Sequence, residues 1–444
     1  MKRHLFIKFL CIVLTVSIAV LSFSSCSLEE LAENIIDELN SAESTPEESV
    51  STTVGTTQTT TAQQTEETTA ETEETTSAAE QITWEDTYVP SYGDTVYISR
   101  RESAEPDEYY WRSTLTGEQR KAYDEIVAGT SQYLTKIKIS AAVSFSESEI
   151  VYRAFTLDHP EVFWYGNGFF ATGPEKNIDD INLSLVFDVS EIPSLKQKVE
   201  AAARQIVDAI PDGTSDIEAE LALYKYLTSN LEYDLKAENA YSLYGALIGK
   251  RCVCQGFAEA FQYMCNMLGI PCISIVGMAT NGRGETEAHK WNAVKIGGKW
   301  YPVDATFGEG SAVGFPLYFN NAAKIETNHT PYQNLIGVPE FYDDDAEYLN
   351  YFGLTYNADD FYDVFMRATH HFSENRSKNS VIAYVVLRAK DQIEENKIKR
   401  LLDENEGEYL DEIIGDYNEV FDDSLVYWNY EFKDGLLIVQ IFRL

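Results

Sequence analysis

The sequence is poor in basic residues and, beyond its N-terminus, has no long apolar run. Its 444 residues include 34 Lys and Arg against 72 Asp and Glu, which gives a formal net charge of −38 at neutral pH. Nucleic acid and anionic membrane surfaces repel a polyanion, so we expect neither to be the main partner. After the first 25 residues, no apolar stretch reaches the roughly 18 residues that a membrane-spanning helix needs.

Basic and aromatic residues are both absent from Ser27 to Glu80, where Thr and Glu predominate. Such a segment cannot bury enough apolar surface to offset the entropy that is lost on ordering. We therefore expect residues 26–80 to form a disordered, self-repelling tether. The 28 Tyr, 22 Phe and 6 Trp of the chain all lie outside the aromatic-free segment, and they indicate at least one sizeable packed core.

The first 25 residues have the pattern of a secretory signal peptide. Lys2, Arg3 and Lys8 accompany an uncharged apolar run over residues 9–23, and small residues follow before Cys26. This ending resembles the lipobox of bacterial lipoproteins, and the resemblance implies that Cys26 is lipidated and becomes the first residue of the mature chain. We therefore expect an extracytoplasmic protein that is lipid-anchored to the bacterial cell membrane.

From residue 81 onward, helix and strand signals alternate without an internal repeat, which indicates an α+β fold. We expect an N-terminal, mostly helical α+β region over 81–205, a core over 206–330, and a linker with a small C-terminal α+β domain over 331–444. His159 precedes a proline that stops a helix, and we interpret it as part of a buried corner. The patterns predict helices over 116–136, 146–158, 193–210 and 215–230, and C-terminal strands over 380–387, 425–432 and 436–442.

Cys254 lies at the start of a predicted amphipathic helix. The unpaired amides and the positive dipole end of a helix N-terminus favour a thiolate over a thiol. The sequence therefore predicts that Cys254 is a nucleophile. The apolar residues of one helix face follow it at spacings of 4, 3 and 4: Phe257, Phe261, Met264 and Leu268.

A predicted hairpin with a Gly-Gly turn brings two further polar residues together. If Ile296 pairs with Lys299 across the turn, His289 and Asp304 are diagonal neighbours on one face of the sheet. A carboxylate there can hold the imidazole in one tautomer and stabilise its cation. The imidazole can then accept the proton of Cys254, as in the triads that catalyse acyl transfer.

Three motifs carry these residues in the chain: Val253-Cys254-Gln255-Gly256-Phe257-Ala258, His289-Lys290-Trp291-Asn292 and Trp300-Tyr301-Pro302-Val303-Asp304-Ala305-Thr306. In sequence and order they resemble the motifs of the transglutaminase-like superfamily, a branch of the papain-like thiol enzymes. The resemblance covers roughly residues 206–330. It implies a helix carrying Cys254, packed on an antiparallel sheet that carries His289 and Asp304. It also implies that Cys254 acts as nucleophile, His289 as general base and acid, and Asp304 as the residue that orients His289, with no metal and no organic cofactor.

These residues predict an enzyme that acts on amide bonds of a protein or peptide, with cell-wall peptide as one option. Cys254 attacks the amide carbonyl to form a thioester, which water or an amine then resolves. Water gives peptidase or amidase chemistry and an amine gives transglutaminase cross-linking, and fold and triad are shared by both kinds of enzyme. We expect the oxyanion hole to use the Cys254 N–H and a side chain such as Tyr241, Tyr244 or Gln255.

Two alternatives stay open from the sequence. One is a catalytically inactive, surface-anchored binding or scaffold lipoprotein. The other is a disulfide-handling protein that uses Cys252 and Cys254, since Cys252 stands where the superfamily commonly has Gly. Lys290 and Phe307 also depart from the superfamily pattern, at positions where Ala and Trp are frequent. None of the three departures removes a residue of the predicted triad.

Overall fold

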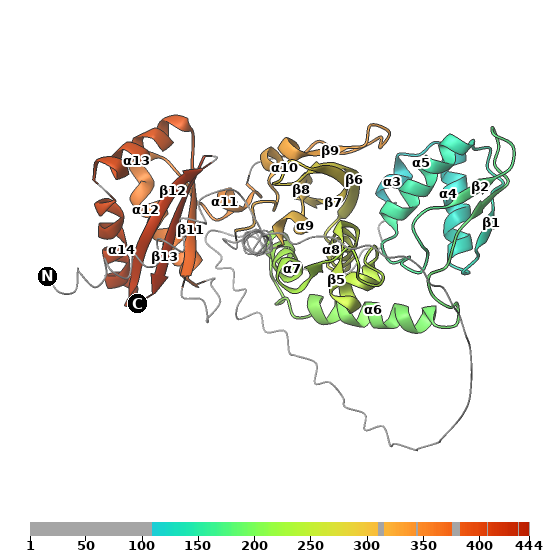
Figure 1. Cartoon of the computed structure of the whole chain (residues 1–444), viewed down its shortest axis with the longest axis horizontal. Coiled ribbons are helices and arrows are strands. Elements are labelled where there is room, and N and C mark those ends of the chain that lie inside the picture. The colour runs from blue at the N-terminus through green and yellow to red at the C-terminus, as the bar shows by residue number, and fades with distance from the viewer. Residues whose placement is uncertain are drawn as a thin grey trace, which may run out of the picture. The chain divides into compact units, whose positions relative to one another are not determined.

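The computed structural model describes residues 109–309, 315–342, 345–374, 382–405, 407–433 and 435–443. The predicted signal peptide, the tether and the lipidation residue Cys26 lie outside the described residues. Within them, no helix combines the length and the apolarity that crossing a bilayer requires. The described chain is an α+β structure with a three-stranded, a two-stranded and two four-stranded sheets (Figure 1).

Three helices and a small sheet form the N-terminal part of the described chain. Helix α5 begins with a capping box, in which Glu147 N donates to Ser144 Oγ at 3.3 Å and Ser144 N to Glu147 Oε2 at 2.9 Å. Helix α4 ends six residues earlier than predicted, and Tyr133 then turns the chain with a φ of 62°. The elements are α3 (Tyr110–Ser113), α4 (Gly117–Thr130), β1 (Lys136–Lys138), α5 (Phe145–Asp158), β2 (Phe170–Thr172) and β3 (Asp180–Asn182).

The predicted buried corner after α5 is confirmed. Asp158 and His159 are each 6% exposed. Tyr123 Oη donates to Asp158 Oδ2 at 3.0 Å and lies 2.9 Å from His159 Nε2. Asp158 Oδ1 also accepts from Trp111 N at 3.0 Å, and Trp111 Nε1 donates to Ser274 O at 3.1 Å. These bonds join the three helices to one another and to the next sheet, so His159 has a structural role.

The central part is an antiparallel sheet of order β8-β7-β6-β9, against which helix α8 packs (Figure 1). The predicted pairing of Ile296 with Lys299 is confirmed, and the register continues to Asn292 opposite Val303. The predicted apolar face of α8 is buried, because Phe257, Phe261 and Met264 are 0% exposed. The sheet and α8 are β6 (Cys272–Thr280), β7 (Thr286–Ile296), β8 (Lys299–Val303), β9 (His329–Pro331) and α8 (Cys254–Met267).

Smaller elements surround this core. Strand β4 (Glu232–Tyr233) pairs in parallel with β5 (Arg251–Cys252), just before α8 begins. Helices α6 and α7 correspond to the helices predicted over 193–210 and 215–230. The remaining elements are α6 (Ile192–Val207), α7 (Asp216–Asn230), the π-helix η2 (Gly245–Gly249), α9 (Ala305–Gly308) and α10 (Ala322–Asn328).

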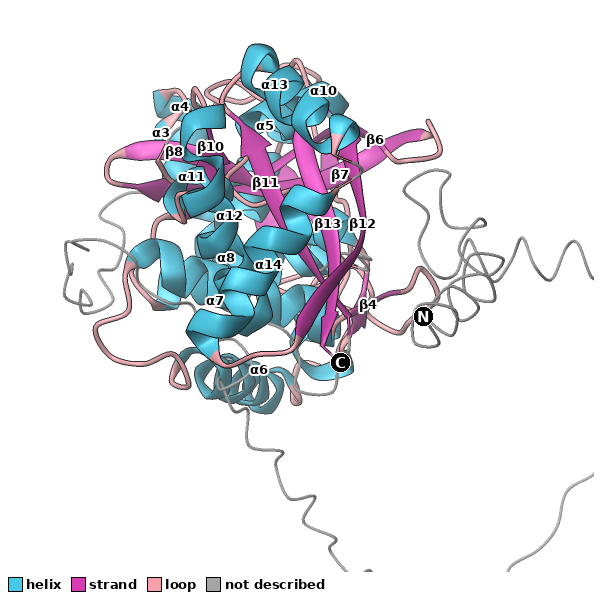
Figure 2. Ribbon diagram, turned by 90° about the vertical axis from the view of Figure 1, so that its left-hand side faces the viewer, coloured by secondary structure: helices cyan, strands magenta, loops and turns pink. Residues whose placement is uncertain are grey.

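The C-terminal part is a second four-stranded sheet, of order β10-β11-β13-β12, with helices packed on it. Strand β13 alternates between buried and half-buried residues, so one face of the sheet is covered. Figure 2 shows α14 in front of these strands. The predicted C-terminal hairpin is confirmed as β12 and β13. The elements are α11 (Tyr348–Tyr351), β10 (Thr355–Tyr356), η3 (Ala358–Asp360), α12 (Phe361–Glu374), β11 (Ile382–Ala389), α13 (Gln392–Glu404), α14 (Glu408–Phe421), β12 (Leu425–Lys433) and β13 (Leu436–Arg443).

Candidate active site

Cys254 is the first residue of α8, as the sequence predicts. Val253 precedes it with extended backbone and gives no side-chain cap, so the first amides of the helix keep their donor capacity. A Cβ on Gly256 would lie 2.9 Å from Cys252 Sγ, so only glycine allows the first turn to pack against Cys252. Cys254 is partly exposed, whereas the other three described cysteines are buried. The helix start therefore presents one accessible thiol.

His289 and Asp304 lie together on the sheet face that the register predicts. His289 Nε2 donates to Asp304 Oδ2 at 2.8 Å, and the two residues are 6% and 1% exposed. Asp304 also starts helix α9, where its Oδ1 accepts from Thr306 N at 2.8 Å and from Phe307 N at 3.2 Å. The helix start thus fixes the carboxylate that orients the imidazole.

The electrostatics of this pair favour a protonated imidazole beside Cys254. Burial alone would lower the pKa of His289, but the charge and hydrogen bond of Asp304 outweigh it, and Cys254 adds to the rise, to about 10. Burial alone would raise the pKa of Asp304, but His289 and His329 hold it well below its usual range. Since Nε2 of His289 is bonded to Asp304, Nδ1 is the nitrogen left for the sulfur. A cation there favours a thiolate.

His329 is a polar residue of this site that the sequence patterns do not reveal. It is the first residue of β9, and its Nε2 lies 2.9 Å from Asp304 Oδ2, the oxygen that also accepts from His289. Its residue exposure is 5%. A strand of three residues gives almost no periodic signal, and this one pairs with β6, about 50 residues earlier in the chain. Only the preference of Thr and Pro for extended structure at 330–331 could have indicated it.

Aromatic rings enclose the two imidazoles. Phe307 contacts both of them, with its ring centre 4.8 Å from that of His289 and 4.9 Å from that of His329. The ring centre of Trp291 lies 5.1 Å from that of His329 and 6.2 Å from that of His289. At position 307, where the superfamily often has Trp, a phenylalanine ring therefore contacts both imidazoles.

Lys290, which also departs from the superfamily pattern, forms an ion pair. Its Nζ lies 2.9 Å from Glu259 Oε1, and the side chains are 8% and 7% exposed. Glu259 Oε2 accepts from Leu243 N at 3.0 Å, and Gln255 Nε2 donates to Glu259 Oε1 at 2.9 Å. The pair connects β7, next to His289, with α8, which begins at Cys254.

The oxyanion-hole side chains named from the sequence lie in different surroundings. Gln255 is already bonded to Glu259 and to Asn167 Oδ1, the latter at 3.2 Å. Tyr244 packs on Phe187 with ring centres 5.1 Å apart, whereas Tyr241 is 48% exposed.

Tyr233 is another tyrosine near the thiol, and the sequence analysis did not select it. It is the partner of Cys252 in the β4–β5 pair and is 36% exposed. Burial, followed by the charges of Cys254 and Glu287, raises its pKa well above the usual range, so its hydroxyl stays a donor. Tyr233 therefore adds a fourth candidate for the second oxyanion donor.

His289, Asp304 and His329 also form a group that could hold a metal ion, with ligand atoms within 4.8 Å of one another. Both imidazole nitrogens approach one carboxylate oxygen, at 2.8 and 2.9 Å. Ligand atoms around a tetrahedral zinc lie farther apart, at roughly 3.3 Å. Hydrogen bonds therefore account for the arrangement of the three side chains.

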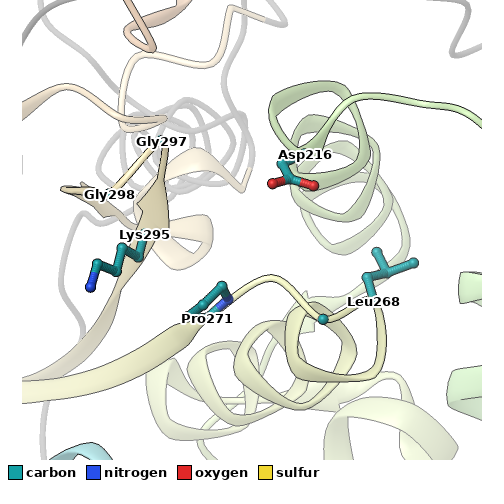
Figure 3. A pocket seen from close by; sticks show the side chains of 7 residues that line it. Asp216, Leu268, Pro271, Lys295, Gly297 and Gly298 are labelled. Atoms are coloured by element: carbon teal, nitrogen blue, oxygen red, sulfur yellow. The ribbon is translucent and has the colours of Figure 1, made fainter. Parts of the chain in front are cut away.

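A surface pocket of about 360 Å³ lies elsewhere on the core (Figure 3). Lys295, one of its lining residues, follows His289 by six residues on β7, which corresponds to about 20 Å along a strand. This pocket is therefore separate from the candidate active site. Its lining residues are Asp216, Leu268, Gly269, Pro271, Lys295, Gly297 and Gly298.

Comparison with known proteins matches the same part of the chain. The family model of the transglutaminase-like superfamily matches residues 201–305. Kyphoscoliosis peptidase of Mus musculus is 28% identical over 138 residues, which cover 26% of this chain and 21% of the relative. The Homo sapiens protein of that name is 27% identical over 117 residues, which cover 24% of this chain and 18% of the relative. The chain thus spans about a fifth of the length of these curated relatives.

Among solved structures, this chain is similar to the ethylmercury-bound periplasmic domain of TgpA from Pseudomonas aeruginosa. The two are 18% identical with a TM-score of 0.21, over 31% of this chain and 58% of that domain. The family match contains Cys254, His289 and Asp304 and the elements that carry them. Residues 201–305 of the chain therefore match a transglutaminase-like domain.

Proposed function

We propose that this protein is an extracytoplasmic thiol enzyme that acts on amide bonds of protein or peptide substrates. The observation that carries the proposal is the His289 imidazole, bonded to Asp304 at 2.8 Å and interacting through its other side with Cys254. The names of the superfamily and of the kyphoscoliosis peptidases support chemistry on proteins.

The reaction follows from these positions. The Cys254 sulfur attacks the amide carbonyl carbon, and the carbonyl oxygen gains the charge, which the Cys254 N–H at the helix start stabilises. His289 gives its proton to the leaving nitrogen as the C–N bond breaks, and a thioester remains. Water or an amine then attacks the thioester, His289 takes the proton of that nucleophile, and the Cys254 sulfur leaves.

The buried thiol at Cys252 argues against the disulfide-handling alternative. Cys252 is 0% exposed. Burial, followed by the charges of Glu259 and Cys254, raises its pKa well above the usual range of a thiol. A thiol that stays protonated and inaccessible cannot resolve a mixed disulfide, because exchange requires a thiolate.

We propose further that the chain is tethered to the outside of the bacterial cell membrane by a lipid on Cys26. The support is the sequence pattern: a basic and then apolar N-terminus, small residues before Cys26, and after it a segment without Lys or Arg that is rich in Thr and Glu. Expression of the full chain and of Cys26→Ala in a bacterium, followed by membrane fractionation, tests this proposal. Release of the wild-type chain from membranes to the same extent as the variant would contradict it.

The activity is tested by trapping the acyl-enzyme. The full chain is incubated with peptides that carry glutamine amides or internal amide bonds, and intact mass and peptide mapping then report acylation of Cys254. We expect a thioester on Cys254 that is absent in Cys254→Ala and nearly absent in His289→Ala, and product analysis with added amine separates transfer from hydrolysis. No acylation with any donor, in a folded protein, would favour the binding or scaffold alternative.

A further inference from the structure

His329 reaches the candidate active site across the sheet. In the register, Gly277 lies opposite His289 on β7 and opposite Pro331 on β9, and Ala279 lies opposite His329. Opposite residues and alternate residues share a sheet face, so His329 projects to the same side as His289. The residues of β6 between them are Gly and Ala, which leave room for an imidazole to extend over the sheet.

Glycine is required at position 277 for this approach. A Cβ there would lie 2.7 Å from Pro331 Cα and 2.8 Å from Trp291 Cη2. Real Cβ atoms do not approach other atoms so closely, so a larger residue would push β9 away from β6 or displace Trp291. The close position of β9, and with it that of His329, depends on this residue.

The His329 ring is held at both nitrogens. Nε2 lies 2.9 Å from Asp304 Oδ2, and Nδ1 lies 2.8 Å from Asn328 Oδ1. Asn328 Nδ2 donates to Thr280 O at 3.3 Å and lies 3.2 Å from the Tyr318 hydroxyl, so its amide oxygen faces the ring. The side chains of His329 and Asp304 are each 1% exposed. Since both partners are oxygen acceptors, the ring donates from Nε2 to the Asp304 carboxylate and from Nδ1 to the Asn328 amide oxygen.

The two carboxylate oxygens of Asp304 accept different hydrogen bonds. Oδ1 is occupied by the amides of Thr306 and Phe307 at the start of α9. Oδ2 accepts from both imidazoles, so His289 and His329 compete for the charge of one oxygen. Each donor draws negative charge from the carboxylate and so weakens its bond to the other donor.

We propose that His329 is a positioning residue that acts through Asp304 on His289. Its N–H fixes Oδ2 in place and limits how strongly that oxygen holds the His289 imidazolium, so the general acid can release its proton to a leaving group. The consequence for catalysis rests on the proposed function. The interaction itself is independent of any substrate.

Other titratable groups face this cluster from the neighbouring elements. Tyr224 on α7, Tyr233 on β4 and Tyr318 before α10 interact with the charge of Asp304, and burial raises the pKa of each of them. These tyrosines stay neutral over the working range. Cys254 is the other titratable group in contact with His289, and the variant Cys254→Ala measures its contribution to the pKa of His289.

Nitrogen-15 NMR of histidine-labelled full chain, with Cys26→Ser to avoid lipidation, measures the interaction directly, because the sequence has only 6 His. His289→Ala and His329→Leu assign the two buried Nε2–H signals. In His329→Leu we expect the His289 Nε2–H proton to move downfield and the His289 ring to keep its proton to higher pH. His329→Gln retains an N–H donor at this position and is expected to stay closer to wild type. Adding Cys254→Ala to each protein is expected to leave the direction of the shift unchanged.

A His289 signal that does not move in a folded His329→Leu variant would overturn the proposal, since a role in packing alone changes stability and not this bond. If His329→Leu does not fold, Asn328→Ala serves instead, because it frees His329 Nδ1 and should shift the His289 signal in the same direction. No shift there would also overturn the proposal. A shift as expected, without any acylation of Cys254, would refute the proposed function while the positioning role stands.

Discussion

Lys290 Nζ and Glu259 Oε1 lie 2.9 Å apart in the interior, and they join the strand that carries His289 to the helix that begins at Cys254. We expect Lys290→Met to destabilise the protein by about 3–5 kcal/mol, because it leaves the Glu259 carboxylate buried without its cation. The free energy of unfolding in urea, measured for wild type and variant, checks this value.

The double variant Lys290→Met, Glu259→Met is the matched control for that prediction. It removes both charges, so it should recover most of the lost stability. Recovery should be incomplete, because Leu243 N also loses its acceptor. Single and double variants of equal stability would show that the unpaired Glu259 charge does not cause the loss of stability in Lys290→Met.

The four described cysteines should differ sharply in reactivity. Cys254 is partly exposed, whereas Cys252 and Cys265 are 0% and Cys272 is 5% exposed. We expect iodoacetamide to label Cys254 alone in the native chain among these four, and all four in denaturant, as read by peptide mapping. Labelling of Cys252 at a comparable rate in the native protein would instead support the disulfide-handling alternative.

The His289 proton should make stability depend on pH. The pKa of His289 is about 10 in the folded protein, against 6.5 for an ordinary imidazole, so the folded state binds this proton more tightly than the unfolded chain. Its contribution is therefore complete below pH 6.5 and is lost as the pH rises through about 10. Denaturant unfolding across this interval should show wild type losing its advantage over His289→Phe as the pH increases.

The control for this pH dependence is Cys254→Ala. The Asp304 interaction outweighs that of Cys254 in raising the pKa of His289, so most of the pH dependence should persist in the control. A stability difference between wild type and His289→Phe that is constant with pH would show that His289 does not hold its proton in the folded state.

Tyr233 should contribute to the oxyanion hole. Its hydroxyl interacts with Cys254, and its partner in the β4–β5 pair is Cys252. We expect Tyr233→Phe to slow acylation of Cys254 by a factor on the order of 10² to 10³, the usual loss for one oxyanion donor, with alkylation of Cys254 unchanged. Tyr384→Phe, on β11 of the C-terminal sheet, is the control. Equal rates of acylation in Tyr233→Phe and wild type would remove Tyr233 from the site.

Local patterns in the sequence predicted the helix of Cys254 and the hairpin of His289 and Asp304. The helix has a regular apolar face, and the hairpin has a turn of two residues that sets its register. Both signals come from residues that are close in the sequence, so tertiary packing did not change the structure that they predict.

Long-range contacts explain what the sequence could not predict. His329 reaches Asp304 from a strand of three residues that pairs with β6 across about 50 residues of chain. Lys290 and Glu259 meet across 31 residues, and neither position has a pattern that marks a buried charge. Such contacts depend on how the sheet and helix pack, which periodicity does not encode.

The alkylation rate of Cys254 as a function of pH shows whether His289 activates the thiol of Cys254. The rate is measured by peptide mapping in wild type and in His289→Ala. We expect rapid alkylation of wild type well below pH 8.5, the ordinary pKa of a free thiol, and its loss in the variant. Slow alkylation at neutral pH in both proteins would contradict this activation, because Cys254 would then behave as an ordinary thiol.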